Sequence, residues 1–215
     1  MPTTQALDAQ ALFQAAYENR YTWDENFPGF LADVILHQGD ISHHGQVTVT
    51  ANFQVTVTGI ESEDIQKEIQ RPLQEVVTHR KRNSFQASHG KNTFTVGDTD
   101  ATGAVEILVT GDAMGSNYRV RNNQVVYVSR VMGGMAFAID HLAALDTGEG
   151  YISTHYKAIF RQPQSNQVLQ EVEFLDTYEK VGGYFLLSKK VVHVSEQGQT
   201  TTTELTLSNL QLLES

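Results

Sequence analysis

The sequence predicts an α+β protein that is mainly antiparallel β: a curved sheet, or half-open β-barrel, of about 9–11 strands with two or three helices covering its concave face. The first observation is at the end of the chain, where 168–213 contains three alternating apolar–polar runs separated by Gly-containing turns at 180–183 and 196–199. The second is a pair of amphipathic helical patterns, at 5–20 and 61–82. The third is that one face of each run is apolar, so one side of the sheet has to be buried against other elements.

The first helix is predicted at 5–20, because apolar residues recur there at steps of three and four along one stripe. Its early positions are small alanines, so Phe13 and Tyr17 supply much of the apolar contact. Thr4 or Asp8 is expected to cap it, since both side chains can accept a hydrogen bond from the first free backbone N–H groups.

An aromatic stretch at 21–30 follows and holds the only tryptophan. It is interpreted either as a connector that plugs one end of the core or as an aromatic lip on a pocket. A strand at 30–38, a turn at 39–45 and a strand at 46–58 are predicted to form a long hairpin, because 46–58 alternates strictly between apolar and polar residues.

The second helix is predicted at 61–82, where acidic residues begin the segment and an apolar stripe follows. Pro72 lies inside this pattern, so a kink or a break after Gln70 is expected. The helix is the natural lid for the dry face of the sheet. The basic cluster at 79–82 is interpreted as complementing the helix dipole, with a phosphate or anionic-lipid contact as the alternative.

Short runs separated by Gly, Asp and Asn are predicted as strands at 85–87, 92–96, 105–110, 117–120 and 124–131. The stretch 133–145 fits both a helix and a strand, and a strand is favoured, with Gly133 and Gly134 as a bend before it. A turn at 146–150 and a strand at 151–161 lead into the closing strands.

Composition narrows the class of protein. No internal repeat or low-complexity linker interrupts the 215 residues, which indicates a single domain over 1–215. The formal net charge of -10 argues against a nucleic-acid partner, and the absence of cysteine removes disulfides and thiolate metal sites. No apolar run approaches the ~20 residues of a transmembrane helix. The N-terminus lacks the features of a secretory signal, so a cytoplasmic location is expected.

The order of elements and the end of the chain resemble the LolA-like half-barrel superfamily. The resemblance is carried by an N-terminal amphipathic helix, a hairpin, a second helix and strands that end in Asp176, Tyr178, Gly182, Gly183, Tyr184, Leu186 and Lys189. More narrowly, 17–30 and 146–161 are similar to a cyanobacterial and plastid family known as a domain of unknown function. The superfamily resemblance implies that acyl chains or apolar groups are carried between sheet and helices. It implies no catalytic residue, and the lack of a signal peptide departs from the exported lipoprotein carriers.

Candidate chemistry is sparse. The histidines at 43–44 are expected in an exposed turn, and His37 across the hairpin could join one of them at a metal, although no metal is predicted. Asp140, His141 and His155 could form an acid–base group if Asp140 and His155 face each other across two strands. An ordinary polar face is the alternative. No nucleophile elbow or phosphate-binding loop is present.

The sequence therefore predicts a non-enzymatic binding protein that holds a lipid, pigment or isoprenoid between sheet and helices, without a cofactor. An assembly factor acting through a strand edge or the 79–82 cluster, or through a peripheral membrane contact, is the first alternative, and an enzyme using Asp140, His141 and His155 is the second. The alternative to any cavity is that the helices fill the concavity completely. Large apolar residues are expected to line the ligand site: Phe13, Tyr17, Trp23, Phe27, Phe30, Phe53, Met132, Met135, Phe137 and Phe174. Ligand identity and oligomeric state are not fixed by the sequence.

Overall fold

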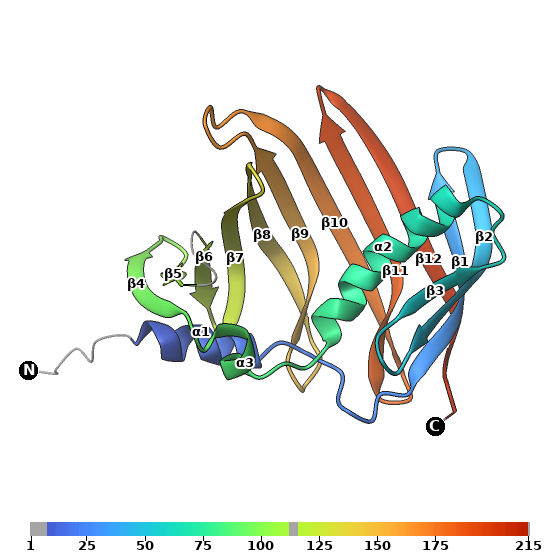
Figure 1. The fold of residues 1–215 in the computed structure, drawn as a ribbon, viewed down its shortest axis with the longest axis horizontal. Helices are drawn as coiled ribbons and strands as arrows, with labels where there is room; N and C mark the ends of the chain where they lie inside the picture. The colour runs from blue at the N-terminus through green and yellow to red at the C-terminus, as the bar shows by residue number, and fades with distance from the viewer. Residues whose placement is uncertain (1–7, 112–115, 215) are drawn as a thin grey trace, which may run out of the picture. The chain divides into compact units, whose positions relative to one another are not determined.

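The computed structural model describes residues 8–111 and 116–214, with the side chain of Met132 left out. The helices are α1 (Ala9–Glu18), α2 (Glu63–Arg80) and α3 (Phe85–His89). The strands are β1 (Gly29–Gln38), β2 (Ile41–Thr50), β3 (Val55–Thr58), β4 (Thr93–Thr99), β5 (Val105–Thr110), β6 (Ser116–Arg121), β7 (Gln124–Met132), β8 (Met135–Asp146), β9 (Tyr151–Arg161), β10 (Val168–Val181), β11 (Tyr184–Glu196) and β12 (Gln199–Leu212) (Figure 1).

The strands form one mainly antiparallel sheet, which confirms the predicted fold class. Hydrogen-bonded neighbours follow the order β3-β2-β1-β12-β11-β10-β9-β8-β7-β6-β5-β4. Over the described residues the sheet is therefore open, with β3 and β4 as its edges. The twelve strands exceed the predicted number by at least one, and the single run expected at 46–58 is divided between two strands.

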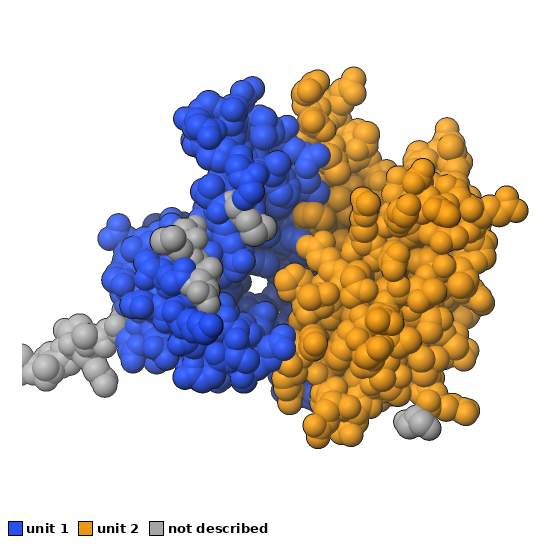
Figure 2. Space-filling view, viewed as in Figure 1, with its two compact units in different colours: residues 1–20, 83–172 blue, residues 21–82, 173–215 orange. Residues whose placement is uncertain are grey.

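The chain divides into two compact units (Figure 2). Unit 1 comprises the described parts of 1–20 and 83–172, with α1, α3 and β4–β9. Unit 2 comprises the described parts of 21–82 and 173–215, with α2, β1–β3, β11 and β12. Strand β10 contributes residues to both units. A single domain over 1–215 stays a prediction.

Unit 1 is built on α1 and an apolar core. Asp8 caps the helix by accepting a hydrogen bond from the backbone N–H of Ala11 at 3.1 Å. Asp8 is one of the two predicted capping residues, and the other, Thr4, lies outside the described residues. The helix packs against β4, β6 and β7, with Phe13 fully buried. Residues 85–87, predicted as a strand, instead belong to α3, because Ser84 caps a short helix that buries Phe85 in the same core.

The strands of unit 1 are joined by tight turns. Asn122 and Asn123 both have positive φ and form the predicted two-residue turn between β6 and β7. Gly133 and Gly134 do the same between β7 and β8, so the ambiguous stretch at 133–145 is a turn followed by a strand. We call the face of this sheet that carries Tyr118 the inner face, because the ring of Phe13 packs on Tyr118 at 4.5 Å.

In unit 2 the predicted strand at 46–58 is wrong. Strand β2 ends at Thr50, a turn follows, and β3 folds back so that Val47 lies opposite Val57. Phe53 stands in this turn with a φ of 67°, a conformation that L residues rarely adopt. The predicted turn at 39–45 is also too long, since β2 already begins at Ile41. Both histidines at 43–44 are therefore strand residues.

Helix α2 is continuous from Glu63 to Arg80, so the predicted break after Gln70 does not occur. Proline removes only one backbone hydrogen bond from the helix, and four apolar side chains of the stripe remain buried: Ile69, Leu73, Val76 and Val77. The helix also covers the edge of β3. Gln70 donates to the carbonyl of Val55 at 2.8 Å, and Gln74 donates to the carbonyl of Phe53 at 2.9 Å and accepts from the N–H of Val55 at 3.3 Å.

Candidate functional site

The aromatic residues expected to line a ligand site are divided among several places. Phe13 and Tyr17 belong to the core of unit 1, where Phe13 is 2% exposed and contacts the rings of Phe85, Phe94 and Tyr118. Tyr17 also donates a hydrogen bond to Ser88 at 2.7 Å, while α3 packs against α1. These rings fill the space beneath the helix.

A second group closes one end of unit 2. Trp23 stacks on Phe27 with ring centroids 4.0 Å apart, and Phe53 stacks beside both rings. Phe30 meets Trp23 edge-on, and the indole N–H donates to the carbonyl of Phe185 at 3.2 Å. Trp23 is therefore buried in the stack, and its only side-chain hydrogen-bond donor, the indole N–H, has a partner. The packing supports the interpretation of 21–30 as a plug for the core.

The remaining ligand-site candidates are Phe174, Met132, Met135 and Phe137. Phe174 in unit 2 lies under the ammonium of Lys190, which is 4.9 Å from its ring centroid. Met132 lies in β7, and its side chain is outside the described part of the structure. Met135 and Phe137 are both on β8 in unit 1, where they differ from the two closed groups in being accessible.

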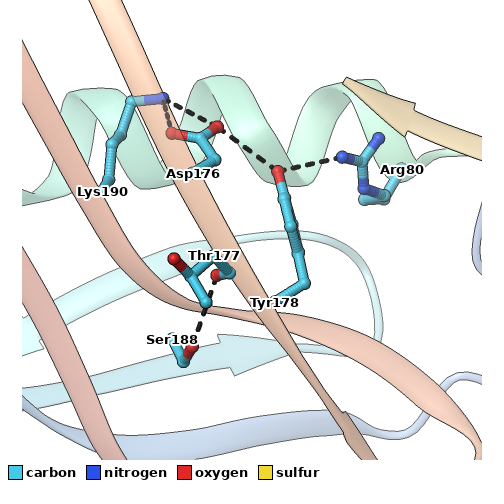
Figure 3. A network of polar contacts seen from close by, with 6 residues as sticks. All are labelled: Arg80, Asp176, Thr177, Tyr178, Ser188 and Lys190. Carbon is cyan, nitrogen blue, oxygen red and sulfur yellow. Dashed lines mark hydrogen bonds and ion pairs between the residues drawn. The ribbon is translucent and has the colours of Figure 1, made fainter. Parts of the chain in front are cut away.

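Lys190, the residue above Phe174, belongs to a buried polar network in unit 2, which Figure 3 shows. Lys190 on β11 donates to both carboxylate oxygens of Asp176 on β10, and Tyr178 donates to the same carboxylate at 3.4 Å. Arg80, the last residue of α2, donates to the hydroxyl of Tyr178 at 3.1 Å. Ser188 donates to the carbonyl of Thr177 at 3.3 Å. The network therefore joins α2 to β10 and β11.

Burial shifts the pKa values of two groups in this network. It raises the pKa of the Asp176 carboxyl above its ordinary value, against the opposing effect of Lys190. Burial also raises the pKa of Tyr178 to about 12. The Nε of Arg80 is buried without a hydrogen-bond partner among the described residues. Arg80 thus connects the last turn of α2 to β10, and its burial leaves it little exposed for the phosphate or anionic-lipid contact considered for the 79–82 cluster.

The accessible apolar surface lies on the inner face of β7–β9 in unit 1. Phe137 lies opposite Phe160, with ring centroids 6.3 Å apart, and Ile139 lies between Val128 and Ala158. These side chains, together with Tyr156 on β9, are half-buried except Ala158, which is buried. At the turn beyond them Met135 is 42% exposed. We call Val128, Phe137, Ile139, Tyr156 and Phe160 the apolar face.

The opposite, outer side of the same strands is polar. Cross-strand register places Glu106, Arg119, Tyr127, Asp140 and Lys157 in one continuous row. Arg119 has its guanidinium 5.2 Å from the Tyr127 ring centroid. Alternating charge in neighbouring positions stabilises such a row in water. The inner face differs in being mainly apolar, although Arg130 also lies on it, opposite Phe137.

The acid–base group proposed from the sequence is not arranged as expected. Lys157 lies directly opposite Asp140, and Ala143 lies opposite His155. His141 is opposite Tyr156, and its Nδ1 shares a hydrogen bond with the hydroxyl of Ser153. The predicted face-to-face pair of Asp140 and His155 is therefore absent from the register, because Asp140 lies two pairs further along the ladder than His155.

Next to the apolar face is a small polar depression of about 100 Å³ in unit 1. It lies where the pairing of β7 and β8 ends, directly after the Tyr127–Asp140 pair. Tyr151 accepts a hydrogen bond there from the backbone N–H of Val125 at 3.0 Å, and burial raises the pKa of its hydroxyl. The lining residues are Arg121, Gln124, Val125, Val126, His141, Leu142, Ala143, Ala144, Tyr151 and Ser153. Sequence reasoning did not find this place, because it depends on where two strands separate.

The histidines of the β1–β2 hairpin do not assemble a site. His37 pairs through its Nδ1 with the hydroxyl of Ser42 at 2.8 Å, and His43 lies opposite Leu36. Over 8–111 and 116–214, no group of three His, Asp or Glu side chains is placed to hold a metal ion. In the same ranges no helix is both long and apolar enough to cross a bilayer.

Comparisons with known proteins place the chain in a family. Among solved structures it is similar to a LolA superfamily protein from Nitrosomonas europaea, at 10% identity over 98% of this chain and 96% of that one, with a TM-score of 0.34. It is also similar to a domain described as outer membrane lipoprotein-sorting from Vibrio parahaemolyticus, at 10% identity over 97% and 96%, with a TM-score of 0.30. At these values neither similarity carries an argument about ligands. No curated protein matches the chain in sequence. A family model described as "Protein of unknown function (DUF3386)" matches residues 4–213, and the chain belongs to that family.

Proposed function

We propose that the chain is a non-enzymatic binding protein and that the apolar face of unit 1 holds an apolar small molecule, such as a lipid, pigment or isoprenoid. The single observation that supports this most is a change in burial along one cross-strand row. Ile107 and Tyr118 are buried in the core of unit 1 and Val128 is half-buried against that core, whereas Ile139, next in the same row on β8, is half-buried and is not part of it. Beyond the core beneath α1, the row therefore continues onto β8 as an accessible apolar surface.

The energetics of such a surface favour binding. Removing about 200 Å² of apolar surface from water contributes about 5 kcal/mol, before the cost of immobilising the ligand is subtracted. Phe137 and Phe160 offer flat rings, and Met135 beside them offers a flexible side chain that adapts to varied shapes. Moderate affinity for elongated or planar apolar molecules is the expected result.

The alternative of an assembly factor has less support. The side chains of Gln70 and Gln74 occupy the backbone groups of Val55 on edge strand β3, which a partner strand would otherwise use. Arg80 is buried, so the 79–82 cluster offers fewer exposed cations than its sequence suggests.

The proposal is tested with two matched substitutions in unit 1. Ile139→Ser changes the apolar face, whereas Ile159→Ser makes the same change on the outer side, where Ile159 lies opposite Ala138. Both isoleucines are half-buried, so their effects on stability should be similar. Binding of a fluorescent apolar probe is measured by titration, and native mass spectrometry is used to detect co-purifying apolar compounds.

We expect Ile139→Ser to weaken probe binding several-fold and Ile159→Ser to leave it unchanged. Equal effects of the two substitutions would contradict the assignment of the face. Failure of the unaltered protein to bind any apolar probe or to co-purify with any such compound would overturn the proposed function.

A further inference from the structure

We propose that the polar depression binds the carboxylate of an amphiphilic ligand whose apolar chain lies on the apolar face. This inference rests on the proposed function and names the ligand class: a molecule with one anionic head group and an extended apolar tail, of the fatty-acid type. It follows from three properties of the depression, namely its donors, its arginine and its position.

The depression is rich in hydrogen-bond donors. Arg121, Gln124, His141 and Ser153 can all donate through their side chains, and none of the ten lining residues is Asp or Glu. The whole chain has a formal net charge of -10, with 25 acidic residues. A recess that collects a guanidinium and excludes carboxylates in such a chain is electrostatically suited to an anion.

Arg121 is uncommitted among the described residues, where no hydrogen bond or ion pair of its side chain is found. Arg119, two positions earlier on β6, contrasts with it, because its guanidinium pairs with Asp100 at 3.4 Å. A guanidinium presents parallel N–H donors that match the two oxygens of a carboxylate. Arg121 is therefore the group that we assign to the head group.

The position of the depression connects it to the apolar face. His141 lines the depression, and its ring centroid lies 5.9 Å from that of Tyr156 on the apolar face. Ile139 precedes His141 by two residues on the same strand, so it points to the same side of the sheet. A head group at Arg121 would leave its tail free to run over Ile139 toward Phe137 and Phe160.

The size of the depression also favours a small head group. A volume of about 100 Å³ is small beside the roughly 300 Å³ or more of pockets that enclose a whole drug-sized ligand, so it suits a head group and not an extended tail. The tail has to remain outside, where the half-buried apolar side chains lie. The two regions together thus match the two ends of an amphiphile.

The experiment compares three ligands of equal chain length: dodecanoate, dodecanol and dodecyl phosphate. Affinities are measured by isothermal titration calorimetry below the critical micelle concentration, on the full chain. Arg121→Gln removes the charge from the depression. Arg71→Gln, on an exposed position of α2 in unit 2, is the control for net charge. Circular dichroism verifies that both variants are folded.

We expect dodecanoate to bind about tenfold or more tightly than dodecanol to the unaltered protein, since a charge-assisted hydrogen bond contributes at least this much. Arg121→Gln should remove that preference and leave dodecanol binding unchanged, whereas Arg71→Gln should preserve both affinities. Equal binding of acid and alcohol would overturn the head-group assignment while the proposed function stands. Preference for the alkyl phosphate would overturn the choice of a carboxylate. Binding of none of the three ligands would overturn the amphiphile assignment, and the probe titration would then decide whether the proposed function also falls.

Discussion

Lys190 on β11 donates two hydrogen bonds to Asp176 on β10, at 2.9 Å to Oδ1 and 3.1 Å to Oδ2, and both side chains are at least 97% buried. A bidentate ion pair in such a place is held by geometry, because either charge alone would be strongly disfavoured out of water. The neighbouring hydroxyl of Tyr178 extends the pair to Arg80 at the end of α2. The network thus fixes where the helix ends relative to two strands of unit 2.

Removing one partner of this pair should destabilise the protein more than removing both. Lys190→Met leaves a buried carboxylate without its cation, and we expect a loss of about 3–5 kcal/mol in the free energy of unfolding. Lys190→Met combined with Asp176→Leu should recover a large part of that loss. The measurement is chemical denaturation of the two single variants and the double variant in a thermodynamic cycle. Strict additivity of the single effects would show that the two charges are not coupled.

The raised pKa of Tyr178 predicts a loss of stability at alkaline pH. An unfolded tyrosine ionises near its ordinary value of 10.0, whereas the folded hydroxyl keeps its proton until about 12. Between these values the unfolded state binds fewer protons, so the free energy of unfolding should fall by up to about 1.4 kcal/mol per pH unit. This contribution is fully present below pH 10 and is lost as the pH rises toward 12.

Tyr178→Phe tests that assignment, since it removes the titrating group and should flatten the alkaline part of the profile. Tyr127→Phe on the outer side of β7 is the matched control and should keep the wild-type slope. Unfolding free energies at pH 9 and pH 11.5 are the quantities to compare. A Tyr178→Phe profile that falls as steeply as that of the unaltered protein would refute the role of this hydroxyl.

The sequence was informative wherever one local pattern determined the element. Asp8 at the start of α1 and the asparagine pair at 122–123 are local signals, and both predictions were confirmed. The run at 46–58 failed because β2 and β3 keep the same apolar face on both sides of the turn, so Val49 and Val55 remain in phase through it. Alternation reports the face of a residue, and it does not report a reversal of direction.

The candidate site was less accessible to sequence reasoning. Lys190 and Asp176 are 14 residues apart, and Arg80 is 98 residues from Tyr178, so only the folded chain brings them together. A signal was nevertheless present, because Asp176 and Lys190 occupy positions of the apolar alternation in their strands. The aromatic candidates were chosen by size alone, which does not distinguish rings that fill a core from rings that remain accessible.

The contact of α2 with the edge of β3 should also be measurable. Gln74→Ala leaves the N–H of Val55 and the carbonyl of Phe53 without the side-chain partner that each has now. We expect a loss of about 1–2 kcal/mol in the free energy of unfolding and faster hydrogen exchange at the Val55 amide. Glu75→Ala, at the next and exposed position of the helix, should change neither. Unchanged exchange at Val55 in Gln74→Ala would exclude a role for this glutamine in protecting the edge.

Substitutions at two phenylalanines of unit 1 should distinguish an effect on stability from an effect on ligand binding. Phe13 is enclosed by aromatic rings beneath α1, so Phe13→Ala should leave a cavity and cost about 3–5 kcal/mol of stability. Phe137 is half-buried on the apolar face, so Phe137→Ala should cost clearly less in stability, because less of its surface leaves contact with the protein.

If the apolar face holds the ligand, Phe137→Ala should nevertheless weaken probe binding several-fold. Phe13→Ala, measured at a temperature where it is fully folded, should leave the affinity unchanged. The comparison requires thermal unfolding and probe titration on both variants. A reversed order of the two affinities would place the ligand in the core beneath α1 and away from β8.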